Sequence, residues 1–431
     1  MRDWMISAPG MEPMPARALA AHLAPTRETT TRTLLLIGED QPGLAVLAHL
    51  ALEAGHRVVL PPRGTGHRLR DLCLPSGSGI NVSTGGTCQA MPVYGTEVRT
   101  GWDLSLFSSG STTGHPRAYG LTLGRLDTVT AWYETIYQVT QDSVIVTALP
   151  VSYNFPFIAG VLLAARLGAR LHLSRTFSEV LTDAAHLANT ADRVIVLANP
   201  VVLDQATGHD PLPARIMIDS GGAPLSTTAI THYRDHGIDV REGYGLTETA
   251  SLTHFDTQAG AASLGTVGTA MPGVTATITR EQGRPLINLA TPALAVPLDL
   301  AEPLPGPVLG TTDLGQIDHD GRLRILGRAD DHPIGGRWPR DTLDALGPLL
   351  RHRCALVRHP SPGQATIRLL TPTSPPSARE LVHHAAEYLG LPREHITITI
   401  QDRPLLHSAK LPTGRPRGAG QAPSRRAESS S

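Results

Sequence analysis

Lysine is almost absent from this sequence: Lys410 is the only one, and every other position of the Lys/Arg type is arginine. The 37 basic residues are matched by 38 acidic residues, which leaves a formal net charge of −1, and no dense basic run occurs in the body of the chain. Nucleic acids and anionic membranes attract proteins through clustered positive charge. The composition therefore argues against both as partners.

Cysteine and long apolar runs are scarce too. Cys73, Cys88 and Cys354 lie far apart and show no CxxC or metal-ligand spacing, so we expect neither a disulfide framework nor a zinc site. The longest apolar stretch, around 155–165, is shorter than the roughly 20 residues that span a membrane. The segment 18–24 is too short and too broken for a signal peptide. We expect a cytoplasmic protein that is neither exported nor membrane-spanning.

Apolar runs that alternate with helical patterns dominate the first 250 residues. The chain has 431 residues, 41% of them hydrophobic, which is enough for one large core and a smaller one. Strand-like and helix-like segments in alternation are typical of parallel βαβ units, so we predict an α/β fold. The expected strands are 33–37, 57–60, 143–148, 169–173, 193–198, 215–219 and 238–241, and the expected helices are 43–54, 157–167 and 227–236.

The pattern changes at both ends of the chain. Residues 1–32 lack clear periodicity and read as a loosely held lead-in or a short helix. Short β-like pieces at 265–278 and 306–326 indicate a small β subdomain. Further on, strands at 354–358, 367–370 and 396–400 and a helix at 378–389 indicate a small mobile α+β domain. We therefore expect a large domain over 1–329, a C-terminal domain over 330–417 and a disordered tail over 418–431.

A dense run of hydroxyl residues and glycines occupies 107–117 (FSSGSTTGHPR), directly after an apolar stretch. Glycines let backbone N–H groups approach a polyphosphate closely, and hydroxyls add donors. The alternative is a merely flexible loop, and the Lys-Ser/Thr pair of a P-loop is absent. The candidate phosphate-binding residues are Ser109, Gly110, Ser111, Thr112, Thr113, Gly114 and Arg117.

A second motif, 241–248 (REGYGLTE), follows a predicted strand. Tyr244 is suited to stack on a purine, Thr247 to bond a phosphate oxygen, and Glu248 to hold the Mg²⁺ that accompanies ATP. The alternative is a tight turn with a solvated Glu248. A further Gly-rich turn after the neighbouring strand favours a cleft at the strand ends. The further candidates for binding the nucleotide are Gly245 in the motif 241–248 and, in the Gly-rich turn, Gly221, Gly222, Ala223 and Pro224.

A third motif pairs a carboxylate with a guanidinium just before the expected domain boundary. Asp313 is suited to accept hydrogen bonds from ribose hydroxyls, and Arg328 to reach ribose or phosphate. Between them, residues 318–321 (DHDG) read as a hairpin turn.

These motifs carry a resemblance. SSGSTTGHPR, SGGAP, GYGLTE and TTDLG with DGRLRILGRADD resemble, in order and type, the signatures of the adenylate-forming superfamily of acyl-CoA synthetases, peptide-synthetase adenylation domains and luciferases. The resemblance covers about residues 34–417. It implies that ATP and Mg²⁺ convert a carboxylic acid into an acyl-adenylate, which is passed to a thiol of CoA or of a carrier-protein phosphopantetheine. It also implies that the small domain rotates about a hinge at Asp330.

Some features depart from the family's pattern. The phosphate loop has one residue more than usual and Arg117 where lysine is usual, which leaves its register open. The part ahead of that loop is shorter than in most members. Two further functions therefore stay under consideration: adenylation with transfer to an amine or another nucleophile, and a retired enzyme that only binds a nucleotide or an acid.

The single lysine lies in PLLHSAKL (404–411), which resembles the family's C-terminal segment with Ala409 in place of the usual glycine. This resemblance makes Lys410 the candidate catalytic lysine. A compact ammonium can follow charge from the carboxylate to the α-phosphate, which a planar guanidinium does poorly. An alternative register pairs Gly414 and Arg415 with the family's Gly-Lys.

The segment 149–157 (LPVSYNFPF) lies where the superfamily places the wall of its acid pocket, and it resembles the aryl-acid-activating members. A capped helix start in the core is the competing interpretation. We expect the pocket surface to lack the aspartate that binds the ammonium of amino acids in the superfamily, and we therefore expect an aryl or other non-amino acid. The candidate pocket residues are Tyr153, Asn154, Phe157, Asn199 and Ser220.

Overall fold

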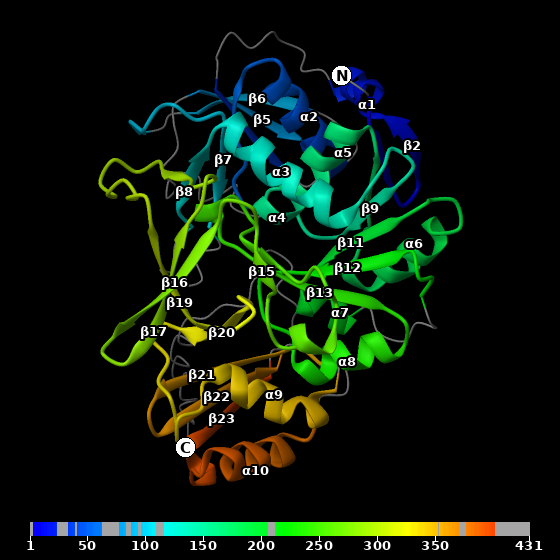
Figure 1. Ribbon diagram of the computed structural model, residues 1–431. Helices are drawn as coiled ribbons and strands as arrows, with labels where there is room; N and C mark the ends of the chain where they lie inside the picture. Colours follow the sequence, from blue (N-terminus) through cyan, green and yellow to red (C-terminus); the bar gives the residue numbers. More distant parts are fainter. Residues whose placement is uncertain are drawn as a thin grey trace, which may run out of the picture.

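Figure 1 shows two large sheets with helices between them, a small sheet beside them and a helix-covered sheet below. The computed structural model describes residues 3–23, 33–38, 41–62, 77–82, 88–93, 96–108, 116–205, 212–351, 353–369 and 376–400. This mixed architecture confirms the predicted α/β class. Within the described part of the chain, no helix is long and apolar enough to cross a bilayer.

The larger sheet runs through the middle of the molecule. Its central strands are parallel and buried, which is why they read as continuous runs of Val, Ile and Leu. In spatial order the strands are β15 (Thr269–Ala270), β14 (His254–Phe255), β13 (Asp239–Tyr244), β12 (Ile216–Ser220), β11 (Val194–Ala198), β9 (Val144–Thr147), β10 (Arg170–Leu173), β1 (Met5–Ala8) and β2 (Met11–Pro15).

The second large sheet combines parallel strands with antiparallel edges. Its order is β18 (Val296–Pro297), β8 (Ala118–Leu121), β7 (Leu104–Phe107), β4 (Arg57–Val59), β3 (Thr33–Gly38), β5 (Gly77–Val82) and β6 (Cys88–Val93). β7 and β8 form an antiparallel hairpin, with Phe107 opposite Ala118. The predicted phosphate loop is therefore the connection between these two strands.

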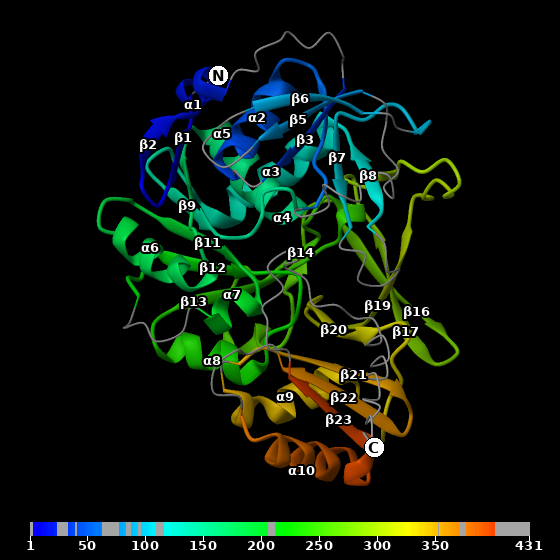
Figure 2. The ribbon, with the colours of Figure 1, turned by 180° about the vertical axis from the view of Figure 1, so that it is seen from behind.

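Helices fill the space between the two sheets and cover the outer face of the larger one (Figure 2). The inner layer comprises α2 (Gln41–Glu53), α3 (Leu123–Tyr137), and a continuous helix made of α4 (Asn154–Pro156), the π-helical η2 (Phe157–Leu162) and α5 (Leu163–Leu167). The outer layer comprises η3 (Phe177–Glu179), α6 (Val180–Leu187), α7 (Pro200–Gln205) and α8 (Thr227–Asp235). The short turns η4 (Thr247–Thr249) and η5 (Ala261–Ser263) follow β13.

Two smaller units complete the described structure. The β subdomain is an antiparallel sheet of β16 (Thr275–Glu281), β17 (Arg284–Ala290), β19 (Leu309–Ile317) and β20 (Leu323–Arg328). Asp318 to Gly321 form the predicted hairpin turn between β19 and β20, closed by a hydrogen bond from Gly321 N to Asp318 O. The last unit has its own core and contains α9 (Pro339–Leu350), β21 (Ala355–Ser361), β22 (Gln364–Leu369), α10 (Ala378–Leu389), η6 (Arg393–His395) and β23 (Ile396–Ile400).

The lead-in was predicted incorrectly as loosely held. Helix α1 (Ala16–Leu23) matches the expected short helix, but it is preceded by β1 and β2, which extend the larger sheet. β1 pairs in parallel with β10, and Trp4 and Ile6 are buried in the main core. Because β1 and β10 lie far apart in the sequence, no local sequence pattern predicts their pairing.

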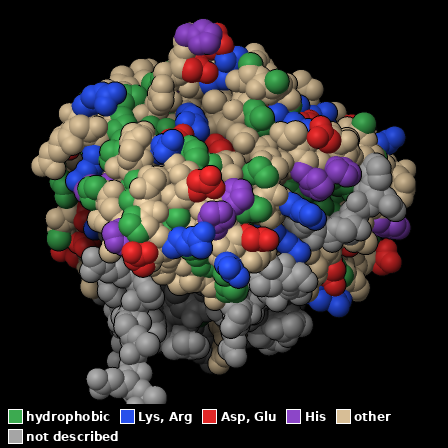
Figure 3. Space-filling model, turned by 90° about the horizontal axis from the view of Figure 1, so that it is seen from below, with side chains coloured by type: hydrophobic (Ala, Val, Ile, Leu, Met, Phe, Trp, Pro, Cys, Tyr) green, Lys and Arg blue, Asp and Glu red, His purple; other side chains and the backbone are tan. Residues whose placement is uncertain are grey.

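Charges of both signs mix on the face of the C-terminal unit. Figure 3 views the molecule from below and shows arginine, acidic and histidine side chains interspersed there. The described surface on that side therefore agrees with the balanced composition. The predicted tail and Lys410 lie outside the described residues.

Candidate active site

A cleft of about 550 Å³ opens where the two large sheets, the β subdomain and the C-terminal unit meet. Its walls come from β8, the segment after β13, β19, the end of β20, α9 and β21. The structure brings most of the described candidate residues to this cleft: Arg117, Gly222, Ala223, Pro224, Tyr244, Gly245, Glu248, Asp313 and Arg328. Ser109 to Gly114 lie outside the described residues, and Thr247 is 2% exposed and is not on the cleft wall.

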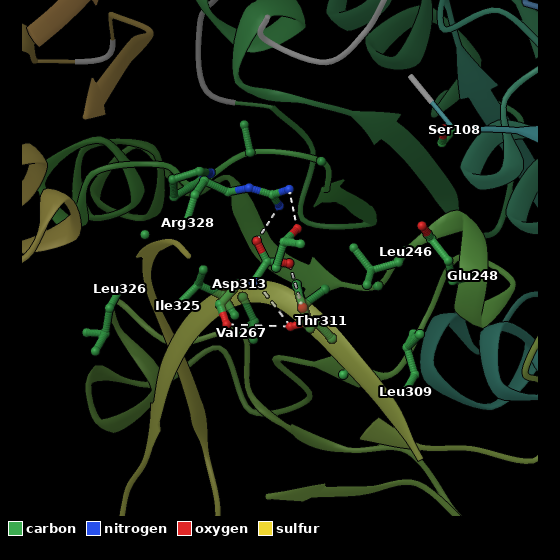
Figure 4. Close-up of a pocket in the computed structure, with 18 of the residues that line it drawn as sticks. Ser108, Leu246, Glu248, Val267, Leu309, Thr311, Asp313, Ile325, Leu326 and Arg328 are labelled. Carbon is green, nitrogen blue, oxygen red and sulfur yellow. Dashed lines mark hydrogen bonds and ion pairs between the residues drawn. The ribbon is translucent and has the colours of Figure 1, made fainter. Parts of the chain in front are cut away.

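Asp313 is the centre of a hydrogen-bonded group on one wall (Figure 4). Asp313 and Arg328 are register partners on β19 and β20, and the guanidinium forms an ion pair with the carboxylate. Tyr244 donates its hydroxyl hydrogen to Asp313 Oδ2 at 2.8 Å, and Arg328 Nη2 donates to Thr312 Oγ1 at 2.6 Å. Burial and the charge of Asp313 raise the pKa of Tyr244, so this hydroxyl stays a donor. Each carboxylate oxygen keeps a second lone pair for a ligand.

Glu248 lies apart from that group, in the direction of Ser108 in Figure 4. A side-chain hydrogen bond joins it to Tyr119 on β8; burial and the nearby carboxylate raise the pKa of the Tyr119 hydroxyl. The turn that carries Glu248 is tight, and the backbone of Ser251 packs against Gly245. A Cβ on Gly245 would stand 1.8 Å from the Ser251 carbonyl oxygen. Only glycine fits there, and this close packing fixes where the Glu248 turn begins.

Arg117 follows the predicted phosphate loop and holds its two ends together. Ser108 N donates to the Arg117 carbonyl at 2.9 Å, and Arg117 N donates to Ser108 Oγ at 3.0 Å. The guanidinium of Arg117 lies 3.5 Å from Glu302 Oε1, and both residues line the cleft. A phosphate that enters here would compete with Glu302 for this cation.

A smaller pocket of about 60 Å³ adjoins the cleft, and Gly222, Gly243 and Gly245 line both spaces. Three of the five predicted acid-pocket residues line it: Tyr153, Asn154 and Asn199. The other two do not. Phe157 is fully buried in the core between the sheets, and Ser220 is 1% exposed at the end of β12.

The expectation that this pocket lacks an aspartate is wrong. Asp219, one residue before Ser220 on β12, lines it and is 1% exposed. Both faces of β12 are buried, so the apolar pattern of this strand did not reveal which side chain meets the pocket. The pocket is otherwise rich in aromatic rings, including Tyr133, Tyr153 and Phe155.

The predicted hinge is held by two adjacent carboxylates. Asp330 is largely exposed and pairs with Arg358 at 2.6 Å. Asp331 is completely buried and accepts hydrogen bonds from Arg328 N at 2.7 Å, Arg358 Nε at 2.8 Å and His359 N at 2.9 Å. Asp331 therefore joins β20 to β21 at the entrance to the C-terminal unit.

Sequence reasoning missed four site residues. Tyr119, Asp219 and Glu302 lie outside the family signatures, and Asp331 ends the signature DGRLRILGRADD but received no role from it. Asp331 had a usable signal, because it stands next to the predicted hinge in the sequence. The other three reach the site only through long-range packing.

Comparisons with known proteins agree with this geometry. The AMP-binding enzyme family matches residues 104–290. A marinolic acid–CoA ligase from Pseudoalteromonas sp. (strain SANK 73390) is 26% identical over an alignment of 243 positions, which covers 49% of this chain and 37% of that ligase. The match thus spans little more than a third of the length of this relative.

Solved structures resemble the chain over nearly its whole length. The acyl-adenylate complex of o-succinylbenzoate CoA synthetase (MenE) from Bacillus subtilis has a TM-score of 0.72 at 19% identity, covering 97% of this chain and 96% of that one. ATP-bound MatB from Rhodopseudomonas palustris has a TM-score of 0.70 at 18% identity, covering 93% and 92%.

The fold is thus that of adenylate-forming enzymes, large N-terminal and small C-terminal units included. Residues 104–290 match the AMP-binding enzyme family, and this match and the CoA ligase relative support the resemblance to the adenylate-forming superfamily.

Proposed function

We propose that this protein uses ATP to convert a carboxylic acid into an acyl-adenylate with release of pyrophosphate, and then passes the acyl group to a thiol of CoA or of a carrier-protein phosphopantetheine. The observation that carries the proposal is the convergence of Arg117, Glu248, Asp313 and Arg328 on one cleft that adjoins an aromatic pocket. Cations, carboxylates and hydroxyls are the groups that a nucleoside triphosphate needs.

The cleft offers a place for each part of the nucleotide. Asp313 accepts hydrogen bonds from the ribose hydroxyls, and Arg328 reaches ribose or phosphate from its ion pair with Asp313. Tyr244, fixed by its hydrogen bond to Asp313, stacks on the purine. Arg117 and the loop Ser109–Gly114 bind the β- and γ-phosphates. Thr247, buried as it is, acts through the turn that positions Glu248 rather than by direct contact.

Glu248 is the residue that would hold Mg²⁺. A carboxylate on the cleft wall is the hard oxygen ligand that this ion prefers, and an Mg²⁺ ion that binds one or two protein carboxylates takes its other ligands from phosphate and water. The bound ion supplies charge neutralisation of the triphosphate. Tyr119, hydrogen-bonded to Glu248, orients the carboxylate toward the cleft.

The acyl part of the substrate enters the smaller pocket through the glycines that line both spaces, so that its carboxylate stays in the cleft beside the α-phosphate. The aromatic walls at Tyr133, Tyr153 and Phe155 favour an aryl acid, and Asn154 offers an amide to a ring substituent. Oxygen attack on phosphorus forms the acyl–phosphate bond and expels pyrophosphate. The thiol then attacks the acyl carbon and AMP leaves.

Pyrophosphate exchange across a panel of aryl, aliphatic and amino acids tests the first step. We expect exchange with at least one aryl acid, and thioester formation when CoA or a phosphopantetheinylated carrier protein is added. Exchange followed by amide formation with an amine, but no thioester, would identify the acceptor as an amine. ATP binding without exchange for any acid would contradict the proposal and favour a retired nucleotide-binding protein.

A further inference from the structure

The carboxylate of Asp219 has one oxygen with a partner and one without. Tyr137 on α3 donates its hydroxyl hydrogen to Oδ2 at 2.5 Å. Oδ1 is buried and has no hydrogen-bond partner among the described residues. Asp219 itself lines the smaller pocket. The chain therefore presents an unsatisfied acceptor at the wall of the pocket proposed for the acyl group.

Oδ1 lies beside a residue that the pocket and the cleft share. A Cβ on Gly243 would stand 3.2 Å from it, and Gly243 lines both the pocket and the cleft. Gly243 has no side chain that could supply Oδ1 with a hydrogen-bond donor.

The arginine on the adjacent strand forms no hydrogen bond with this carboxylate. Arg241, the register partner of Asp219 on β13, directs its guanidinium to Asp239 and to the Thr257 carbonyl. Tyr133, which also lines the pocket, has its hydroxyl hydrogen-bonded to Ser251 Oγ at 2.8 Å. Both groups are committed elsewhere, so the protein supplies no second partner for Asp219 from these neighbours.

An unpaired buried carboxylate oxygen is costly. A buried acceptor without a partner loses its hydration and gains nothing in return, and the loss is larger for a charged group. Burial raises the pKa of Asp219 to about 7, against the opposing effects of the Tyr137 hydrogen bond and Arg241. A chain that keeps such a group at the wall of a binding pocket gains from it when a ligand supplies the missing donor.

We propose that Asp219 determines specificity by accepting a hydrogen bond at Oδ1 from an O–H or N–H group on the acyl part of the substrate. This inference rests on the proposed function and refines it: the acid is one that bears a hydrogen-bond donor, within an aromatic pocket. A hydroxyaryl acid supplies a neutral O–H, and an amino acid supplies an ammonium N–H. Both share the donor that Oδ1 lacks.

Pyrophosphate exchange with matched acids tests the inference. The panel pairs benzoate with its hydroxy and amino derivatives, and phenylpropanoate with phenylalanine. We expect the wild type to prefer a donor-bearing acid over its unsubstituted parent by about 10- to 100-fold in kcat/KM. Asp219→Ala should reduce that ratio to near one while the KM for ATP changes little, because Asp219 is not among the residues lining the nucleotide cleft.

Asp219→Asn distinguishes the two kinds of donor and keeps the shape of the side chain. The amide oxygen still accepts from a neutral hydroxyl, so a hydroxyaryl preference should survive in part, whereas a preference for an ammonium should vanish. The matched control is Asp235→Asn, an exposed carboxylate at the end of α8 that lines neither pocket. It should leave the ratio unchanged.

Two outcomes would overturn the inference. One is a folded Asp219→Ala or Asp219→Asn protein with the wild-type acid profile, and the other is a wild type that prefers the unsubstituted acids. Either result leaves the proposed adenylation intact, because exchange still occurs. Absence of exchange by the wild type with every acid would instead refute the proposed function, and this inference with it.

Discussion

Glu248 occupies the cleft wall with its carboxylate held by Tyr119. We predict that Glu248→Gln lowers the rate of pyrophosphate release at least about 100-fold, because loss of the metal-binding charge removes several kcal/mol of transition-state stabilisation. Circular dichroism should show an intact fold. Glu281→Gln, on an exposed end of β16, is the matched control and should behave as the wild type. Near-wild-type release by Glu248→Gln would remove this residue from the mechanism.

Lys410 lies outside the described residues, and its role stays a prediction from the sequence. We predict that Lys410→Arg slows adenylation by a factor of about 100 or more, because a guanidinium cannot follow the charge on the reacting phosphate as an ammonium does. Thioester formation from supplied acyl-adenylate should survive, since the resemblance implies that the C-terminal domain has then rotated the lysine away.

The companion variant for Lys410 is Arg415→Ala, which tests the alternative register. If Arg415→Ala loses adenylation and Lys410→Arg does not, the assignment moves to Arg415. If Lys410→Arg slowed adenylation and thioester formation equally, the assignment would also be contradicted, because it requires the lysine to act in adenylation alone.

The ionisation of Asp219 also makes the stability of the fold depend on pH. Burial raises its pKa from an ordinary 3.8 to about 7, with Tyr137 and Arg241 opposing the shift and Tyr133 packed nearby. Between pH 4 and 7 the folded state keeps a proton that the unfolded state has lost. Raising the pH over this range therefore costs the fold up to roughly 1.4 kcal/mol per unit, and the effect levels off above pH 7.

Asp219→Asn lacks this titration. We predict that urea unfolding shows the variant gaining stability relative to the wild type as the pH rises from 5 to 7, with only a small further gain from 7 to 8. Asp235→Asn, an exposed carboxylate at the end of α8, provides the comparison. A stability difference that is the same at pH 5 and pH 8 would show that Asp219 is not shifted in this way.

At the scale of elements, the turn after β13 depends on Gly245. We predict that Gly245→Ala destabilises the fold by more than about 2 kcal/mol, because its Cβ would overlap the Ser251 carbonyl and this rigid backbone cannot move aside. Gly124→Ala is the contrasting variant, since nothing lies within 4 Å of a Cβ there and the position is in α3. It should be neutral or stabilising by up to about 1 kcal/mol. Equal melting temperatures for the two variants would contradict the argument.

Elements whose sequence pattern is contained in a short segment could be predicted, and elements that depend on long-range pairing could not. The buried parallel strands β9, β11 and β12 were predictable because continuous runs of β-branched residues need no partner to be recognised. β1 was not, because its burial follows from pairing with β10 across the chain. Helix α9 was missed although Pro339 stands at its first position, which is a helix-start signal.

The same division applies to the site. Asp313 and Arg328 were predictable because a turn of four residues folds their strands into register. The acid pocket was only partly predictable: Asn154 begins a helix and lines the pocket, but Phe157, three residues later, turns into the core. Both faces of β12 are buried, so its sequence does not reveal which side chains line the pocket. Asp219 was missed for this reason.

At the scale of the whole molecule, buried ion pairs hold the C-terminal unit against the larger body. Arg340 on α9 is 3% exposed and lies 3.7 Å from Glu242 on β13, whose own carboxylate accepts a hydrogen bond from Leu225 N. Asp344, one turn further along α9, accepts from Arg340 and from Thr227 N at the start of α8. Burial raises the pKa of Glu242, and Arg340 opposes that shift.

If the C-terminal domain rotates between half-reactions, as the resemblance implies, these pairs must break in one of the two states. Removing one partner of a buried pair costs about 3–5 kcal/mol in the state that contains it. We predict that Arg340→Met changes the ratio of the adenylation rate to the rate of thioester formation from supplied acyl-adenylate by at least about tenfold. It should also make the segment around Asp330 more sensitive to protease.

The control is Arg322→Met, whose ion pairs with Asp318 and Asp320 lie on the β19–β20 turn away from this contact. A uniform loss of both rates in Arg340→Met would mean that the contact stabilises the fold without selecting a state, because only a state-specific contact can shift one half-reaction against the other.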